Sequence, residues 1–588
     1  HDGTADDEKG DLIFKTNDGN DATSPTERLR IDSNGSILTA TLGTDNVHLG
    51  EGAGASIVSG GNYNTLVGKD AGTAITTGDY NTAVGQLALD ANTTGSNNTA
   101  LGRISLSAAT TADNNTAVGY AAGEAVTTGA NNVLVGASSG DAITTGGDNT
   151  AVGTGALSAA TTASNNTAVG FEAGATTTTG GLNTFFGRKA GRGVTTGTEN
   201  TFVGNSAGRD GTKTGSHNIG VGTLALNDLT SGNYNTAVGS SALGTNTTAS
   251  ENTAVGYGSL QANTTGAGNV AVGKDSFFDL TTGNGNVAVG FGAAANATTT
   301  DHSVFVGYEA GGNANLTGHD QVMVGFRAGR AISSGSANVF IGRESGVNTT
   351  TSSENVAIGF QTMYTADSGG TNTAVGGQSL NKVSGFDNTA IGFASGYEIS
   401  SGHNNICIGH NAGRSASPSG SITSGSDTIC LGDNDINDLF CADTSISSSD
   451  SRDKTDVTNF TGGLDWVNAL RPVTYKWDKR TWYGDDDNPM GTPDGSQKRD
   501  RLHVGFLAQE VLQVEQDNGF ADTNDTSIIV RNNLEGNSYG LKYERLVPVL
   551  VNAIKELSAK NDALEAQNTT QATQIADLIT RVEALETE

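Results

Sequence analysis

A short motif that ends in glycine recurs along most of the chain and constrains its fold more than any other feature. Asn-Thr-Ala-Val-Gly, or a close variant, occurs 23 times from Gly50 to Gly432, mostly at a step of 17 residues. Asparagine stands four residues before the glycine in 20 copies, the exceptions being Ser303, Gln321 and Thr428. Seventeen residues are too few for a propeller blade or a two-helix repeat. They suit one turn of a parallel β-solenoid, and this all-β fold is our prediction.

Composition agrees with long strand ladders and narrows the function. No proline occurs between Pro25 and Pro418, and proline cannot donate a ladder hydrogen bond. The formal charge of −30 argues against nucleic acid and anionic membranes as partners. No apolar run of about 18 residues exists, so we expect no membrane insertion. Three cysteines are too few for a disulfide framework.

The two faces of each repeat strand have different side chains. In the copy at Asn115, Thr116 and Val118 point to one face and Ala117 to the other, because strands have a period of two. The residue before glycine is Val, Ile or Leu in most copies, so we expect it to fill the interior. The Ala or Phe position is then expected outside, as a stripe that symmetric neighbours cover, which predicts a homotrimer of parallel chains. The recurrent asparagines are predicted to form a hydrogen-bonded ladder.

The repeats at residues 46–432, called the shaft below, resemble the left-handed β-roll head repeats of YadA-like trimeric adhesins, whose turns read Asn-Ser-Val-Ala-Ile-Gly. This resemblance implies a β-roll. Residues 1–45 are interpreted as an N-terminal β connector or cap with two strands. Residues 433–448 are interpreted as a linker or distal tip, in which Phe440 and Cys441 are candidates for contact with a target.

Composition changes after about residue 445, where repeats stop and aromatic and charged residues become frequent. Four blocks then follow in a characteristic order. They read Ser449-Asp-Ser-Arg-Asp-Lys454, Leu470-Arg-Pro-Val-Thr-Tyr-Lys-Trp477, His503-Val-Gly-Phe-Leu-Ala-Gln-Glu-Val511 and the segment Tyr543 to Leu557. Together they resemble the intramolecular chaperone of endosialidases and other phage tail proteins, the peptidase S74 family. We assign residues 449–540 to this α+β chaperone domain and 541–588 to its C-terminal helix.

The resemblance implies that the segment assembles a trimeric fibre and then cuts itself off. Carried onto this chain, Ser449 is the nucleophile, Lys454 is its base, and the scissile bond joins Ser448 to Ser449. A serine needs such a base, and a lysine serves only where burial lowers its pKa. The alternative is a domain that chaperones without cutting.

Five further residues support the motif. Asp450 and Arg452 are expected to fix the local turn, and Gln509 and Glu510 belong to the third block. His503 is interpreted as a packed or interface histidine, with a catalytic assist as the alternative.

The last forty residues are predicted to form a coiled-coil helix, because apolar and amide residues alternate at spacings of 3 and 4. This seam consists of Leu550, Ile554, Leu557, Asn561, Leu564, Asn568, Gln571, Ile575, Leu578, Val582 and Leu585.

Three functions fit these features. The first is a trimeric phage tail fibre in the virion tail, with tail proteins at its N-terminal end and a host-surface glycan or protein as receptor. The second is a cellular surface fibre or adhesin with the same chaperone. The third, a glycan-degrading tailspike, needs two carboxylates held in a groove, whereas acidic residues in the repeats are scattered. Any enzymatic activity expected is one self-directed Ser-Lys cleavage. We expect no cofactor and no metal, since the run Asp485–Asp487 has no matching His or Cys cluster.

Overall fold

The computed structural model divides into two compact units, His1–Asn355 and Val356–Glu588, and each is described by itself. At the N-terminus, β1 (Leu12–Thr16), β2 (Thr26–Ile31) and β3 (Ile37–Thr39) form an antiparallel sheet, with one strand more than expected. The structure describes residues 12–16, 26–31, 37–39, 43–312, 315–366, 368–436, 451–483, 491–521, 527–532 and 539–587.

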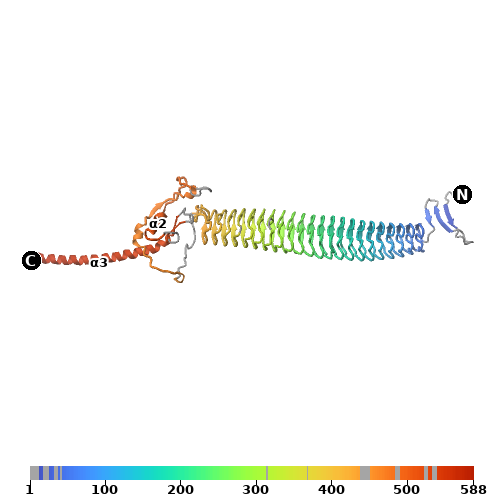
Figure 1. Ribbon diagram of the computed structural model, residues 1–588, viewed down its shortest axis with the longest axis horizontal. Coiled ribbons are helices and arrows are strands. Elements are labelled where there is room, and N and C mark those ends of the chain that lie inside the picture. The colour runs from blue at the N-terminus through green and yellow to red at the C-terminus, as the bar shows by residue number, and fades with distance from the viewer. Residues whose placement is uncertain are drawn as a thin grey trace. The chain divides into compact units, whose positions relative to one another are not determined.

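The repeats of the first unit form a parallel β-solenoid, as predicted. Each turn contributes one three-residue strand, which pairs in register with the next strand along the chain, as Ala117 with Leu134. Figure 1 shows these turns stacked one upon another. The strands are β4 (Val47–Leu49), β5 (Thr65–Val67), β6 (Thr82–Val84), β7 (Thr99–Leu101), β8 (Thr116–Val118), β9 (Val133–Val135), β10 (Thr150–Val152), β11 (Thr167–Val169), β12 (Thr184–Phe186), β13 (Thr201–Val203), β14 (Ile219–Val221), β15 (Thr236–Val238), β16 (Thr253–Val255), β17 (Val270–Val272), β18 (Val287–Val289), β19 (Val304–Val306), β20 (Val322–Val324) and β21 (Val339–Ile341).

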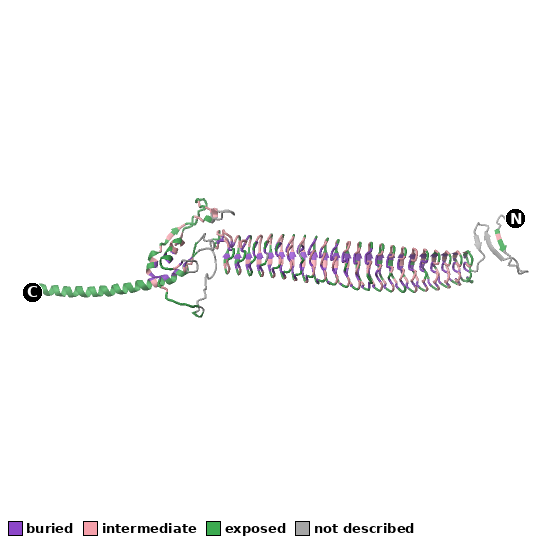
Figure 2. Ribbon diagram, viewed as in Figure 1, coloured by how far each residue is buried: buried purple, intermediate pink, exposed green. Residues whose placement is uncertain are grey.

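The predicted assignment of the two strand faces is wrong. The middle residue, exemplified by Ala117, is fully buried, whereas Thr116 and Val118 on either side are only partly buried. The middle residues of the strands, mostly Ala or Phe, therefore form a buried column inside the turns (Figure 2). The physical reason is the narrowness of a 17-residue turn, in which buried residues of the opposite leg, such as Leu106, already occupy the interior. Small residues fit beside them, while β-branched residues suit a pleated, half-exposed surface.

Interior side chains alternate in size in a way that keeps this narrow core filled. Where the middle of a strand is Phe185, the residue six positions later is Gly191, and a Cβ there would collide with the phenyl ring. Where the middle is Ala151, the corresponding residue is Leu157, and both are fully buried. In these turns one position of the pair is large and the other small. Where both are small, as at Ala117 and Gly123, Leu106 and Leu134 of the neighbouring turns fill the space beside the glycine.

The recurrent asparagines form the predicted ladder inside the solenoid. Asn132 is fully buried, and its Nδ2 donates to Asn115 Oδ1 at 3.0 Å and to the carbonyl of Gly146 at 3.1 Å. Its own Oδ1 accepts from the backbone N–H and the Nδ2 of Asn149. Each amide thus satisfies its hydrogen-bonding groups against the neighbouring turns, as a buried polar group must.

The second unit continues with five solenoid strands and then a small α+β region that ends in a long helix. Among its described residues, no helix has the length and apolarity to cross a membrane. The strands are β22 (Val356–Ile358), β23 (Thr373–Val375), β24 (Thr389–Ile391), β25 (Ile406–Ile408) and β26 (Ile429–Leu431). The later elements are η1 (Ser451–Asp453), α1 (Leu464–Ala469), β27 (Val473–Tyr475), η2 (Arg480–Tyr483), β28 (His503–Gly505), α2 (Ala508–Asp517), β29 (Val530–Asn532), β30 (Tyr539–Leu541), η3 (Tyr543–Arg545) and α3 (Leu546–Glu586).

Candidate functional site

Three of the four C-terminal sequence blocks meet at one small sheet. The second and third blocks pair through β27 and β28, which are antiparallel with Tyr475 opposite His503. The fourth block joins them through Tyr543, whose hydroxyl accepts a hydrogen bond from the N–H of Phe506 at 3.1 Å. A Cβ at Gly505 would collide with this hydroxyl, so the glycine makes the approach possible.

An ion pair links the second and third blocks at the surface. Arg471 Nε lies 3.1 Å from Glu510 Oε2, and a second guanidinium nitrogen contacts the other carboxylate oxygen. The hydrogen bond to Glu510 raises the pKa of the Arg471 guanidinium. A bidentate pair of this kind fixes orientation more than it adds stability at an exposed site.

A hydrophobic core holds α1, α2 and the start of α3 together. The Trp466 ring meets Phe460 at a centroid distance of 5.5 Å in an edge-to-face arrangement. Asn552 in α3 donates to the carbonyl of Phe460 at 2.7 Å, and Glu556 accepts from the N–H of Leu464 at 2.9 Å. The segment before α1 is therefore tied to the first turns of α3. The buried core residues are Trp466, Val511, Val514, Ile529, Val530, Leu546 and Val549.

Beyond its first turns, α3 has no buried residue although it carries the predicted apolar seam. Buried positions on this 41-residue helix are confined to Leu546, Val549 and Ala553. Ile554 is 66% exposed and Leu585 is 73% exposed, and Figure 2 shows the rest of the helix as exposed. An apolar seam at heptad spacing, open along its length, is the surface by which helices pair in coiled coils.

Part of this small α+β region matches one known family. Residues 449–520 match the family model of the chaperone of endosialidase, peptidase S74. The matched residues, called the S74 segment below, span the first three sequence blocks. No curated protein and no solved structure matches the chain. The chain therefore carries an S74-type intramolecular chaperone segment after its β-solenoid.

The proposed cleavage site lies outside the described residues, which include only the second part of its motif. Ser448, Ser449 and Asp450 lie outside them, as do Phe440, Cys441 and the run Asp485–Asp487. Arg452 and Lys454 are described and exposed at the short turn η1, where the N–H of Lys454 donates to the carbonyl of Ser451. The roles assigned to these residues stay predictions. Among described side chains, no group of three or more His, Cys, Asp or Glu could hold a metal ion.

His503 and Gln509 of the third block differ in their surroundings. The His503 ring is half-buried and stacks on Tyr475 at 5.6 Å, with Trp477 edge-on at 6.2 Å. Gln509 lies exposed on α2. The histidine therefore occupies an aromatic cluster on the small sheet.

The sequence reading missed Glu515, which is fully buried in the second half of α2. Its carboxylate accepts from the N–H groups of Ile528 at 2.9 Å and Val530 at 3.2 Å, from the N–H of Ile529, and from Ser527 Oγ at 3.1 Å. A buried carboxylate that receives several donors stabilises the loop that supplies them. Its spacing of four from Val511 placed it on the apolar face and could have revealed it.

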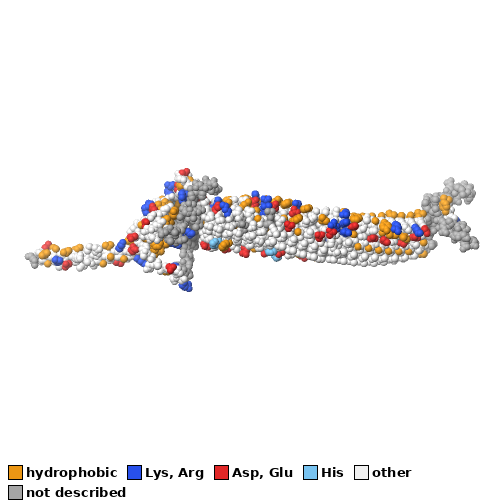
Figure 3. All heavy atoms as spheres, in the orientation of Figure 1, with side chains coloured by type: hydrophobic (Ala, Val, Ile, Leu, Met, Phe, Trp, Pro, Cys, Tyr) orange, Lys and Arg blue, Asp and Glu red, His pale blue; other side chains and the backbone are white. Residues whose placement is uncertain are grey.

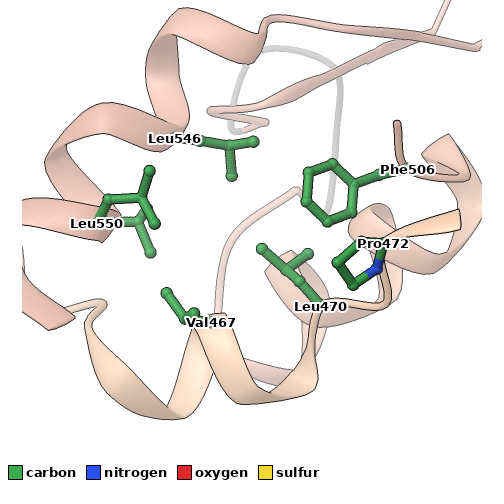
Figure 4. Close-up of a pocket in the computed structure, with 7 residues that line it drawn as sticks. Val467, Leu470, Pro472, Phe506, Leu546 and Leu550 are labelled. Carbon is green, nitrogen blue, oxygen red and sulfur yellow. The ribbon is translucent and has the colours of Figure 1, made fainter. Parts of the chain in front are cut away.

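An apolar cavity of about 260 Å³ lies between α1, the residues that flank β27 and β28, and the start of α3 (Figure 4). One of its residues, Leu550, is also the first residue of the exposed seam. The cavity is therefore continuous with the apolar surface of α3. It is lined by Val467, Leu470, Pro472, Phe506, Leu546, Val549 and Leu550.

Proposed function

We propose that the chain is a subunit of a homotrimeric phage tail fibre, whose C-terminal part assembles the shaft and then cuts itself off between Ser448 and Ser449. The observation that carries the proposal is the exposed seam of α3. In one chain this seam leaves Ile554, Leu557 and Leu564 in water, each more than half exposed. Three parallel helices would bury it, and the amide residues Asn561, Asn568 and Gln571 would fix register and strand number.

A second apolar column supports three parallel chains along the shaft. The residue before the motif glycine is apolar in all 23 copies and lies on the outer face of the solenoid. Leu101 is 45% exposed, Phe186 57% and Val238 38%. This column, rather than the buried Ala and Phe column, is the stripe that symmetric neighbours would cover.

The order of assembly follows from the difficulty of parallel pairing. Parallel strands far apart in sequence pair slowly and are open to misassembly. A coiled coil at the C-terminus brings three chains into register before the repeats wind, so that identical turns face one another. The S74 segment would then be needed only until the shaft has folded.

The proposed cleavage uses two residues of the motif, Ser449 as nucleophile and Lys454 as base. The Ser449 hydroxyl attacks the carbonyl carbon of Ser448 as Lys454 takes its proton. The C–N bond of the peptide then breaks as Lys454 returns that proton to the Ser449 nitrogen, and an ester joins Ser448 to the Ser449 oxygen. Water then hydrolyses the resulting ester and leaves a carboxylate on Ser448 and a free amine on Ser449. Lys454 is exposed in the single chain, whereas a general base lysine needs burial. Neighbouring subunits would supply that burial, which makes cleavage wait for assembly.

The proposed place of the fibre is the virion tail. Its N-terminal sheet would join tail proteins, and its shaft would reach a glycan or protein on the host surface. The formal charge of −30 disfavours binding to nucleic acid. Removal of the chaperone would leave the shaft kinetically trapped, a useful property for an extracellular particle.

The experiment that tests the proposal compares the wild-type chain with Ser449→Ala by denaturing gel, intact mass and sedimentation. We expect wild-type fragments that end at Ser448 and begin at Ser449, a whole Ser449→Ala chain, and trimers in both. Ser451→Ala is the matched control and should still cut. A monomeric wild type would overturn the assembly proposal, while whole chains in trimeric form would overturn only the cleavage.

A further inference from the structure

Two cysteines occupy equivalent places in the last two strands of the solenoid. Cys407 is the middle residue of β25, and Cys430 is the middle residue of β26. In every earlier solenoid strand this position holds another residue, mostly Ala or Phe. Both cysteines are buried, and both are free thiols in the structure. A thiol therefore appears twice, in adjacent turns, at one end of the shaft.

The strand register brings the two side chains together. β25 and β26 are parallel, and Cys407 is the register partner of Cys430. Neighbouring strands lie about 4.8 Å apart, and a disulfide joins residues whose Cα atoms are about 4.4–6.8 Å apart. Register partners in parallel strands point to the same face, so both side chains enter the interior. Because the Cβ atoms of a disulfide lie within about 3.5–4.5 Å, the bond needs the two strands to approach by roughly a few tenths of an ångström.

The surroundings of the two thiols differ. A Cβ at Gly413 would lie 2.8 Å from Cys407 Sγ, so this glycine leaves room for the sulfur, and Ser419 Oγ donates to Cys430 Sγ at 3.4 Å. Burial raises the pKa of the Cys407 thiol to about 12, and the neighbouring Cys430 thiol adds to the rise. Cys407 therefore stays protonated at neutral pH, and Cys430, in the last turn, is the thiol that reacts first.

The last turn is the part of the solenoid that a covalent bond would stabilise most. Its step from Gly409 to Gly432 is 23 residues, whereas most steps are 17. β26 pairs with β25, and no later strand among the described residues stacks on its other side. A terminal turn with one neighbour opens more easily than an internal one. A bond between Cys407 and Cys430 would close this long turn and hold it to the turn before.

Access to the sulfurs depends on that opening. Cys407 is fully buried and Cys430 is 3% exposed. On the face in view in Figure 3, the atoms of successive turns pack closely, so a small reagent would reach these sulfurs when the last turn opens. Oxidation of this pair is therefore expected to be slow and confined to the end of the shaft.

We propose that Cys407 and Cys430 form a disulfide that locks the last turn, with a small disulfide such as oxidised glutathione as the oxidant. The Cys430 thiol loses its proton, and its sulfur attacks oxidised glutathione, which releases one glutathione thiolate. The Cys407 thiol then loses its proton, and its sulfur attacks the Cys430 sulfur of the mixed disulfide, which releases the second. The two protons end on the two glutathione thiolates, so the protein loses two hydrogen atoms and the oxidant gains them.

The redox environment sets when this lock can form. Thiols stay reduced in the cytosol and are oxidised in extracellular surroundings. The last strands can therefore pair while both cysteines are free, and the bond follows outside the cell. In the proposed fibre it would secure the end of the shaft nearest the cleavage site. This timing rests on the proposed function, whereas the bond itself does not.

The test uses the full-length chain in its native state. Wild type, Cys441→Ser and Cys407→Ala are incubated with excess oxidised glutathione until the intact mass no longer changes. Free thiols are then alkylated, and the chains are digested without reductant. Cys441→Ser removes the one cysteine outside the pair, and Cys407→Ala places alanine where most earlier strands already have it. We expect a peptide that joins Cys407 to Cys430 in the wild type and in Cys441→Ser, and none in Cys407→Ala.

Hydrogen exchange on Cys441→Ser then tests the lock. Amide protection in β25 and β26 should be at least about tenfold higher in the oxidised protein than in the reduced one, with no change in β10 to β12. Free thiols at both positions after the incubation, a bond that includes Cys441 or joins two chains, or equal protection in the two states would each overturn the inference. Sedimentation and cleavage of the same samples report separately on the proposed fibre.

Discussion

Replacing Asn149 by alanine should break the internal amide ladder at one turn. The Asn149 side chain donates to Asn132 Oδ1 at 3.0 Å and to the carbonyl of Ala163 at 2.9 Å. It also accepts from the N–H and the Nδ2 of Asn166, each at 3.1 Å. The substitution removes these four hydrogen bonds in a closed interior. Asn132 Oδ1 keeps the backbone N–H of Asn149 as a donor, whereas the carbonyl of Ala163 and the two N–H groups of Asn166 lose these partners.

The expected cost follows from that count. Each buried group left unsatisfied costs about 1–3 kcal/mol. Because the three groups share one site and relax together, we expect local opening to become easier by roughly 3–6 kcal/mol. Since a factor of ten corresponds to about 1.4 kcal/mol, amide protection in the adjoining turns should fall by about a hundredfold or more.

Hydrogen exchange followed by mass spectrometry on the full chain measures this loss, because it reports local opening free energies. Asn149→Ser is the control, since the chain already has serine in the ladder. Ser303 Oγ accepts from the N–H of Gln321 at 3.0 Å, so a hydroxyl keeps part of the network. If Asn149→Ala lost less than tenfold protection, or no more than Asn149→Ser, the ladder would not be the stabilising element we infer.

Three further predictions concern the core, one buried charge and the helix. Phe185→Ala should lower the free energy of unfolding by about 3–5 kcal/mol. Adding Gly191→Leu should recover most of this loss, because the pair then matches Ala151 and Leu157. Chemical denaturation of both variants measures the two changes, and no recovery would contradict the pairing of a large with a small side chain. Lys213 is buried, with Nζ 2.9 Å from the carbonyls of Asn227 and Leu229, and burial lowers its pKa to about 8. Between about pH 8 and 10.5 the unfolded chain then holds more protons than the folded one, so the free energy of unfolding should rise by about 3 kcal/mol over this range. Thermal scans across this range should show the rise in the wild type and not in Lys213→Met. The same slope of stability against pH in both proteins would refute the prediction. Ile554→Asp should abolish trimers in sedimentation while Lys555→Asp, off the seam, should not, and trimers in both would exclude the seam as the assembly surface.

The shaft was predictable from the sequence because the same motif recurs in every turn. One motif at a step of mostly 17 residues identified the solenoid, and the recurrence of its asparagine identified the ladder that Asn132 and its neighbours form. The direction of the strand faces was not predictable from residue type. Ala117 and Val118 are both apolar, and only the width of the turn decides which one lies inside.

The C-terminal region was predictable as blocks, but not as contacts. The pairing of Tyr475 with His503 and the approach of Tyr543 to Gly505 depend on tertiary packing across long loops. Glu515 escaped notice because a glutamate on a helix is usually solvated, and its four donors come from residues 527–530, which carry no motif.

The ladder has a consequence for how such a chain can change in evolution. Each turn bonds to the turns on either side through the same groups, so a whole repeat that is gained or lost rejoins matching partners. Duplication or deletion of one whole turn would therefore alter the reach of the shaft with little local penalty, because the asparagine of the turn that remains, such as Asn132, would meet an equivalent asparagine again. Length in this protein is a trait that recombination between its own repeats can adjust in fixed steps.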